Sequence, residues 1–304
     1  MRRVFAVTLT ALALLAAGGC ATNDPGAGAT PTATAAHYPV TVGSLTLAKR
    51  PERIVSFSAT ATEMLFAIDA GSQVVAVDSY STYPTNAPKT DLSAYKPNVE
   101  AIAKYQPDLV VLSNDTEKIV SQLAALKIPT FLAPAAETLD DTYRQIDEFG
   151  QLTGHRAEAT ALVGRMRDDV AKLLASVPKR ATALRYYYEL DQTYYSVTSK
   201  TFIGSLFASA GLVNIADELS KDGNPYPQLS AEAIVNASPD LIFLADTKCC
   251  GQTAATVAGR AGWSGITAVR DGGVVELDDD IASRWGPRVV DLLRSITDAA
   301  AKAK

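Results

Sequence analysis

The sequence predicts an α/β fold of two lobes, each with a parallel sheet covered by helices, joined by one long helical segment. Three observations support this fold class. Short β-branched runs alternate with helical stretches, the same scheme occurs twice, and a segment with helical spacing separates the two copies. Two such lobes joined by a stiff helix place the natural binding site in a cleft between them, where strand ends and loops converge.

The first lobe is expected over residues 38–137. Its strands are the runs "RIVSF", "QVVAV", "DLVVL" and "PTFLA", and "ATEMLFAID" and "TEKIVSQLAAL" are the helical stretches between them. Strands of this kind, apolar almost throughout, are typical of a parallel sheet that is buried on both faces.

The second lobe is expected over residues 179–304 and repeats the first. The run "ALRYYYEL" begins it, "TFIGSLFASAG" resembles the first helical stretch, and "DLIFL" and "GGVVELD" supply later strands. Between the lobes, residues 138–178 carry apolar side chains at three-to-four spacing, with acids near the start and Pro178 at the end. This pattern predicts one long helix, or two nearly continuous ones.

The most specific sign of duplication is a pair of segments 132 residues apart. Residues 98–112 read "NVEAIAKYQPDLVVL" and residues 230–244 read "SAEAIVNASPDLIFL", so that Glu100 and Glu232 head matching helices. Asn98 and Ser230 are good N-caps, and an acid two residues later favours the helix dipole by about 0.3–1 kcal/mol without any partner.

The start of the chain has the features of an export signal. A charged beginning, an apolar run too short to span a bilayer comfortably and small residues before Cys20 predict a signal peptide over residues 1–19. The segment resembles a bacterial lipoprotein signal, which implies a lipidated Cys20; an ordinary signal with an incidental cysteine is the alternative. Residues 20–37, without a large apolar cluster, are expected to be a flexible tether.

Together these segments resemble the iron-chelate and cobalamin class of substrate-binding proteins of ABC importers. The likeness covers the chain from about Arg53 to the C-terminus. It implies the class III periplasmic-binding-protein fold and a monomer held by a lipid anchor on the extracytoplasmic face of the cell membrane. It also implies that Glu100 and Glu232 dock onto a permease dimer that works with a cytoplasmic ATPase, one acid for each half of a twofold partner.

The resemblance also implies a ligand, a bulky metal chelate held between the lobes, and no resident cofactor. "VDSYSTYP", "LSAYKPNVE" and "NPYPQLSAE" place Tyr80, Tyr95 and Tyr226 where cobalamin-binding members have aromatic residues, although the last two stand where Trp is expected. Tyrosine suits a ferric siderophore equally, so a cobalt corrinoid is favoured and a ferric chelate is the alternative. The segment "LDDDIASRWGPRVVD" resembles the last cleft loop of the family. It adds the candidates Asp280, Arg284 and Trp285, whereas Asp278 and Asp279 could be turn residues.

The two remaining cysteines are adjacent. Cys249 and Cys250 follow a strand in a protein expected to be exported, where thiols tend to oxidise, and a disulfide between them is favoured. Two reduced thiols, or a pair of soft metal ligands, are the alternatives.

Several other classes of protein are disfavoured. A net charge of -5 without a basic cluster argues against nucleic acid, and His37 and His155 are too few for a bare metal-ion site. The sequence has no glycine-rich dinucleotide or phosphate-binding fingerprint and no placed nucleophile and base, so no catalytic residue is proposed. A lipoprotein that senses ligand without transport remains an alternative.

Overall fold

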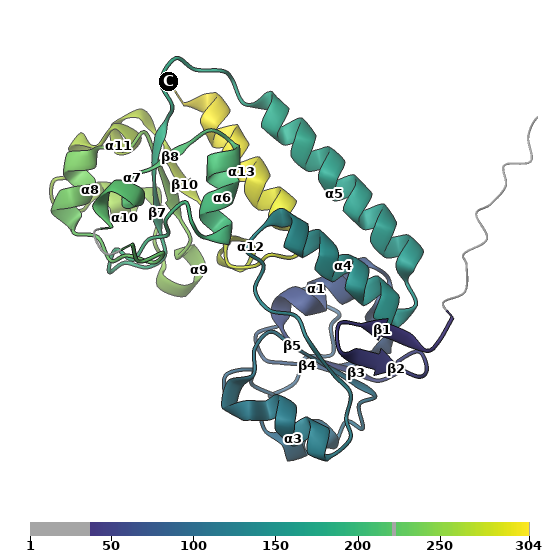
Figure 1. Ribbon diagram of the computed structural model, residues 1–304. Coiled ribbons are helices and arrows are strands. Elements are labelled where there is room, and N and C mark those ends of the chain that lie inside the picture. The colour runs from purple at the N-terminus through teal and green to yellow at the C-terminus, as the bar shows by residue number, and fades with distance from the viewer. Residues whose placement is uncertain (1–36, 221–222, 304) are drawn as a thin grey trace, which may run out of the picture. The chain divides into compact units, whose positions relative to one another are not determined.

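The computed structural model describes residues 37–220 and 223–303 and contains two four-stranded parallel sheets (Figure 1). The first sheet has the order β4-β3-β5-β6 and the second the order β8-β7-β9-β10, so the same topology occurs twice. The strands are β3 (Ile54–Phe57), β4 (Val74–Val77), β5 (Leu109–Leu112), β6 (Thr130–Leu132), β7 (Arg185–Glu189), β8 (Val213–Asn214), β9 (Leu241–Leu244) and β10 (Val274–Glu276). The predicted fold class and internal repeat are confirmed.

Burial explains why the central strands read as continuous apolar runs. Every residue of β3, β5 and β9 is buried, because helices cover both faces of each sheet. The lobe helices are α1 (Ala59–Ala67), α2 (Val99–Ala103), α3 (Ile119–Ala125), α6 (Phe202–Ser209), α7 (Ile215–Leu219), α8 (Ala231–Ala237), α9 (Thr247–Cys250), α10 (Ala254–Ala258), α11 (Thr267–Asp271), α12 (Asp279–Ala282) and α13 (Val289–Lys302). Short 3₁₀ turns occupy Ala70–Gln73, Thr116–Lys118 and Trp263–Gly265.

The repeated Pro-Asp pair joins neighbouring strands in both lobes. The Asp108 carboxylate accepts the backbone N–H of Arg53 at 2.8 Å, and the Asp108 N–H donates to the Arg53 carbonyl at 3.0 Å. Asp240 makes the same two bonds with Arg185, each at 2.8 Å. The acid of each pair therefore sets the register at the start of two parallel strands, which is a structural reason for its recurrence.

A hairpin that the sequence did not predict precedes the first sheet. Strands β1 (Val40–Val42) and β2 (Leu45–Leu47) pair antiparallel around Gly43, whose φ of +56° suits a residue without Cβ. The Tyr38 hydroxyl donates to the Leu152 carbonyl at 2.9 Å, so the start of the described chain is bound to α4 (Leu139–Thr153).

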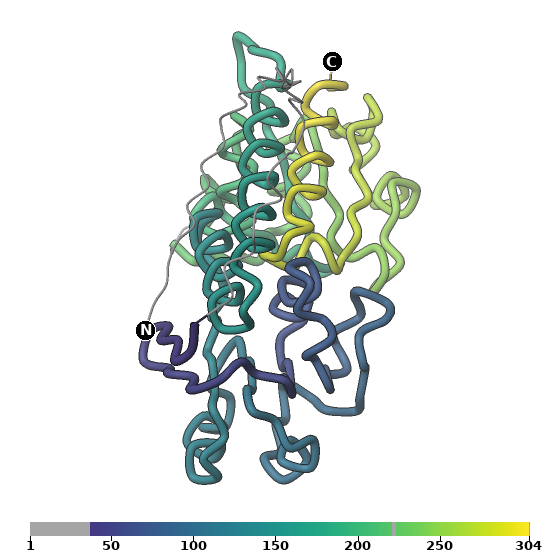
Figure 2. Tube along the Cα trace, turned by 90° about the vertical axis from the view of Figure 1, so that its right-hand side faces the viewer, coloured from purple at the N-terminus to yellow at the C-terminus, as the bar shows by residue number. Residues whose placement is uncertain are grey.

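Residues 138–178, predicted as one long helix or two nearly continuous ones, form two helices separated only by Gly154 and His155. Helix α4 ends at Gly154, which has a φ of +80°, and α5 (Arg156–Ser176) runs back beside it (Figures 1 and 2). A Cβ on Gly150 would lie 2.5 Å from the Ala159 Cβ, so glycine permits this close antiparallel pairing. Further along, Arg167 of α5 bonds to Asp140 of α4 at 2.8 Å. Helix α5 alone then leads to the second sheet.

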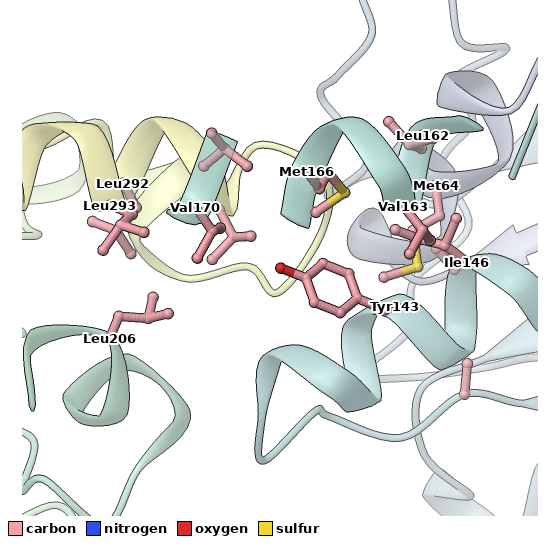
Figure 3. Close-up of a cluster of buried hydrophobic side chains, with 14 of the residues drawn as sticks. Met64, Tyr143, Ile146, Leu162, Val163, Met166, Val170, Leu206, Leu292 and Leu293 are labelled. Atoms are coloured by element: carbon pink, nitrogen blue, oxygen red, sulfur yellow. The ribbon is translucent and has the colours of Figure 1, made fainter. Parts of the chain in front are cut away.

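One apolar stripe of α5 contacts helices from both halves of the sequence (Figure 3). The stripe consists of Leu162, Val163, Met166, Val170 and Leu173, at the spacing that keeps side chains on one helical face. It belongs to a single buried cluster with Met64 of α1, Tyr143 and Ile146 of α4, Leu206 of α6, and Leu292 and Leu293 of α13. This shared core ties the connecting helices to both lobes.

The predicted signal peptide, Cys20 and all of the tether before His37 lie outside the described residues. Within residues 37–220 and 223–303, no helix has both the length and the apolar character that crossing a membrane requires.

Candidate ligand-binding site

Three tyrosines follow the carboxyl end of β4 and remain exposed. The exposed fractions are 52% for Tyr80, 44% for Tyr83 and 69% for Tyr95. The rings of Tyr80 and Tyr95 meet edge to face with centroids 4.9 Å apart. Single exposed apolar side chains are common, but a cluster of them often marks a binding surface, and Tyr80 and Tyr95 form such a pair.

Two further exposed tyrosines follow the strands of the second sheet. Tyr195 is 40% exposed and Tyr226 is 50% exposed. Their segments lie side by side, since Tyr195 pairs with Gln228 in an isolated bridge and the Ser196 N–H donates to the Pro227 carbonyl at 2.9 Å. The structure thus places Tyr80, Tyr95 and Tyr226 on the surface at loops after the strands, and it adds Tyr83 and Tyr195, which the sequence analysis did not single out.

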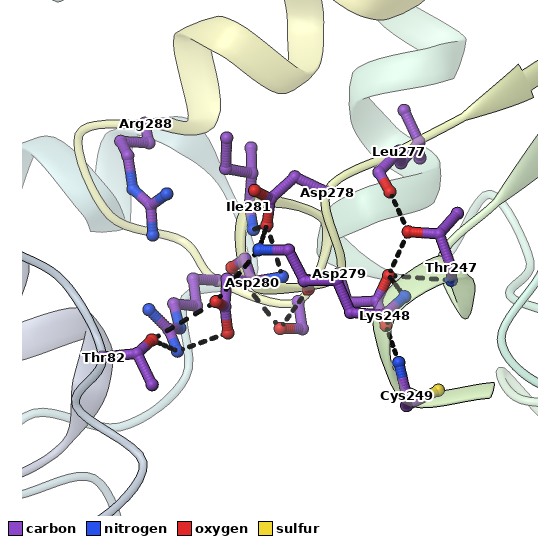
Figure 4. Close-up of polar contacts among 12 residues, drawn as sticks. Thr82, Thr247, Lys248, Cys249, Leu277, Asp278, Asp279, Asp280, Ile281 and Arg288 are labelled. Carbon is purple, nitrogen blue, oxygen red and sulfur yellow. Dashed lines mark hydrogen bonds and ion pairs between the residues drawn. The ribbon is translucent and has the colours of Figure 1, made fainter. Parts of the chain in front are cut away.

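The adjacent cysteines form the last turn of α9, directly after β9. Their sulfur atoms are joined as a disulfide, and Gly251 closes the turn with a φ of +66°. The carboxylate of Asp279 caps this helix, accepting the backbone N–H groups of Thr247 at 2.9 Å and Cys249 at 2.8 Å (Figure 4). Burial opposes ionisation of Asp279, but the N–H donors outweigh it and lower its pKa. Asp279 is therefore a structural cap.

A row of charged side chains runs from α9 toward the first lobe (Figure 4). The Lys248 ammonium lies 2.7 Å from Asp278 and 3.3 Å from Asp280. The hydroxyl of Thr82, two residues after Tyr80 in the first lobe, donates to Asp280 at 3.3 Å. The predicted residue Asp280 thus contacts both halves of the chain.

The predicted residue Arg284 is bonded across the two lobes. Its guanidinium lies 2.8 Å from Asp280 and 2.8 Å from Glu63 of α1, and it donates to the Tyr80 carbonyl at 3.1 Å. Arg288, from the same loop, also binds Glu63 and stacks 4.2 Å from the centre of the Tyr83 ring. Neither Glu63 nor Arg288 was identified in the sequence, although "SRWGPR" contains both arginines in the loop already assigned to the site.

Trp285, the third residue predicted from this loop, contacts helix α4. Its indole N–H donates to Gln145 Oε1 of α4 at 3.0 Å, and its carbonyl accepts the Thr142 hydroxyl at 2.9 Å. The side chain is partly buried and packs against the shared core. These contacts join the C-terminal loop to α4, and the role of Trp285 toward a ligand stays a prediction.

A buried polar group lies beneath α9 inside the second lobe. Glu189 forms a bidentate pair with Arg260, both bonds 2.6 Å long, whereas the fully buried Asp246 has no hydrogen-bond partner for either carboxylate oxygen among the described residues. Burial, reinforced by the nearby charge of Glu189, raises the pKa of Asp246 to about 7. The backbone carbonyl of Asp246 accepts from Cys250 at 3.3 Å, so this carboxyl lies at the base of the disulfide turn.

The two acids of the repeat occupy equivalent exposed positions. Glu100 and Glu232 each stand at the second position of a short helix, α2 and α8. In each case the predicted N-cap, Asn98 or Ser230, accepts a backbone N–H, from Ala101 at 2.8 Å and from Ala233 at 3.1 Å. The equivalence is structural, and docking to a permease remains a proposal.

A cavity of about 550 Å³ is found elsewhere, where α5 ends near the close of α6. Leu174, Val177, Arg180 and Leu212 help to line it, and none of the predicted site residues does so. Among the described residues, no group of three or more His, Cys, Asp or Glu side chains is arranged to hold a metal ion.

The described chain thus has two parallel sheets of identical order, with exposed tyrosines on loops of both lobes. The chain belongs to the family described as "Periplasmic binding protein", whose model matches residues 54–281. This is a family of binding proteins, as the sequence predicted.

Three similarities are to proteins whose printed names state a ligand or a role in transport. A cobalamin-binding protein of Halobacterium salinarum is 32% identical over 264 residues, covering 84% of this chain and 71% of that protein. A Bacillus subtilis ABC transporter substrate-binding lipoprotein is 27% identical, covering 86% of this chain and 85% of the relative. The structure of a possible iron-binding protein from Staphylococcus epidermidis has a TM-score of 0.70 and 25% identity, covering 83% of this chain and 99% of that one.

Proposed function

We propose that this protein is an extracytoplasmic solute-binding lipoprotein that captures a cobalamin-like corrinoid and delivers it to an ABC importer. The proposal is supported most directly by the exposed tyrosines of both lobes, because such rings can cover the apolar surface of a large ligand while their hydroxyls stay hydrated. The names of the Halobacterium and Bacillus relatives support the corrinoid, the importer and the lipoprotein character.

The alternative ligand is a ferric siderophore. Tyrosine and arginine side chains suit such a chelate as well, and the similarity to a possible iron-binding protein supports this alternative. The two ligands differ in their visible absorption. We therefore propose incubating the purified protein with cyanocobalamin, with haem and with several ferric siderophores, desalting it and recording the spectrum. Retention of the cobalamin spectrum alone supports the proposal, and retention of a ferric siderophore alone contradicts the corrinoid assignment.

Capture and delivery are expected to depend on different residues. From their exposure, Tyr95 and Tyr226 each have about half or more of a ring to bury, worth about 1–2 kcal/mol, or about 5- to 30-fold in Kd per ring. Tyr95→Ala with Tyr226→Ala should weaken binding in solution. Glu100→Ala with Glu232→Ala should leave solution binding unchanged and reduce uptake, since exposed acids mainly orient an encounter with a charged partner.

The division of roles is contradicted if both double variants lose ligand affinity equally. Binding of the ligand-loaded protein to the purified permease and its ATPase separates transport from a sensor that lacks a permease. Labelling with a radioactive fatty acid, compared with a Cys20→Ala variant, tests the proposed anchor at the cell membrane, and light scattering tests the expected monomer.

A further inference from the structure

A single buried carboxylate connects the two lobes. Glu63, on α1, accepts Arg284 Nη1 at 2.8 Å, Arg288 Nε at 2.9 Å and Arg288 Nη2 at 2.5 Å. The side chains of Glu63, Arg284 and Arg288 are 2%, 10% and 18% exposed. These three residues, called the Glu63 clasp below, join positions more than 200 residues apart in the sequence.

The clasp also holds the segment that carries two of the exposed rings. Arg284 Nη2 donates to the Tyr80 carbonyl and to the Thr82 hydroxyl, both at 3.1 Å. The guanidinium of Arg288 lies 4.2 Å from the centre of the Tyr83 ring, a stacking distance for a cation on an aromatic face. Both arginines therefore contact the tyrosine segment while sharing one carboxylate.

The C-terminal loop approaches α1 closely at Gly286. A Cβ added to Gly286 would lie 3.3 Å from Glu63 Oε2 and 3.6 Å from Thr60 Cγ2. A side chain here would press the loop away from α1 and lengthen the bonds of the clasp without removing any charge.

We propose that Glu63 is a positioning residue for ligand capture, which fixes the Tyr80 and Tyr83 segment relative to the C-terminal loop. This inference rests on the proposed function. The clasp is too buried to offer a ligand much surface, whereas the rings beside it are exposed. Removing Glu63 leaves two largely buried guanidinium groups to share the remaining partners, and a buried charge without its partner is strongly unfavourable. The tyrosine segment is then expected to loosen.

Two variants weaken the clasp in different ways, and a third provides a matched control. Glu63→Gln removes the shared charge, and Gly286→Val keeps every charge but forces the loop from α1. Glu189→Gln removes a buried carboxylate that also forms short arginine bonds, but its partner Arg260 lies within the same lobe. All three should lower the melting temperature, so they are compared with wild type at equal intervals below their own transitions.

The first measurement needs no ligand. Amide hydrogen exchange of residues 78–83 should rise at least about tenfold in Glu63→Gln and Gly286→Val, because the segment opens locally without unfolding the whole protein. In Glu189→Gln the exchange of this segment should stay at the wild-type level. The second measurement is the dissociation rate of cyanocobalamin, which should rise at least about tenfold in the two clasp variants and stay within about twofold in the control.

The outcomes separate the positioning role of Glu63 from the corrinoid assignment. Equal increases in exchange in all three variants would show general destabilisation and refute positioning by Glu63. Unchanged exchange in a folded Glu63→Gln protein would also refute positioning by Glu63. If Glu63→Gln does not fold, Gly286→Val decides by the same criteria. If wild-type protein binds no cyanocobalamin, the corrinoid assignment fails while hydrogen exchange still decides whether the clasp holds the segment.

Discussion

Replacing Asp246 by Asn should change how the stability of this protein depends on pH. The Asp246 side chain is fully buried, and both of its carboxylate oxygens lack partners among the described residues. Burial is the main cause that raises its pKa from 3.8 to about 7, the charge of Glu189 and then that of Asp279 add to the shift, and Arg260 partly offsets it. The folded protein therefore keeps a proton that the unfolded chain releases.

The sign and size of the effect follow from this difference. Below about pH 4 the carboxyl is protonated in both states and contributes nothing to the pH dependence. Between about pH 4 and pH 7 only the folded state holds the proton, so the free energy of unfolding falls as the pH rises. Above pH 7 the full penalty is present, about 4 kcal/mol at 1.36 kcal/mol per pKa unit, and about 2 kcal/mol if the fold relaxes around the charge. Asp246→Asn removes this penalty.

Urea unfolding at pH 4.5, 6.0, 7.0 and 8.5 measures the difference directly. We expect the variant to equal wild type within about 1 kcal/mol at pH 4.5 and to exceed it by about 2–4 kcal/mol at pH 8.5. Asp141→Asn is the control of opposite sign: the Thr138 hydroxyl and neighbouring N–H groups lower the pKa of Asp141, so its contribution is present at neutral pH and lost in acid. Parallel stability profiles for wild type and Asp246→Asn would refute the reasoning.

Three further predictions concern the disulfide, the connecting helices and the hinge. Mass spectrometry of unreduced protein should show the peptide with Cys249 and Cys250 two hydrogens lighter than after reduction, and free thiols in fresh protein would contradict the bond. The double variant Cys249→Ser with Cys250→Ser should barely change the melting temperature, since a bond between neighbours closes almost no loop. Met166→Ala should cost about 2–5 kcal/mol of unfolding free energy, because its side chain is 3% exposed within the shared core, and a loss below about 1 kcal/mol would show that the core collapses around the gap. Scattering profiles with and without ligand should nearly superimpose, because α5 and its packed stripe leave few residues to absorb a large rotation; a contraction of several ångström would exclude this.

The sequence by itself determined the duplicated architecture. Buried parallel strands must be apolar on both faces, so "DLVVL" and "DLIFL" identify β5 and β9 without reference to any contact. The N-caps Asn98 and Ser230 could also be predicted from the sequence, because a cap acts on backbone N–H groups only a few residues away. The candidate tyrosines were found differently, from the resemblance to cobalamin-binding proteins. Only Tyr80 closely follows a strand, β4, whereas Tyr95 and Tyr226 lie further along their loops, where no local pattern identifies them.

The periodicity of apolar residues could not determine the path of residues 138–178. Apolar side chains at three-to-four spacing suit a continuing helix and a helical hairpin equally well. Gly154 permits the reversal, and the missing Cβ of Gly150 leaves room for Ala159, but this close approach exists only once the two helices are packed.

The charges at the centre of the molecule depended on tertiary structure most of all. Glu63 is one acid in an apolar helix, and nothing near it in the sequence shows that Arg284 and Arg288 bind it. Asp246 stands at the N-cap position of α9, where an Asp side chain usually caps the helix. In the structure the Asp279 carboxylate caps α9 instead, and the Asp246 carboxyl is buried. Local sequence fixes helices, strands and caps because their interactions are local, whereas the partner and the dielectric environment of a charged group are set by residues brought together from distant parts of the chain.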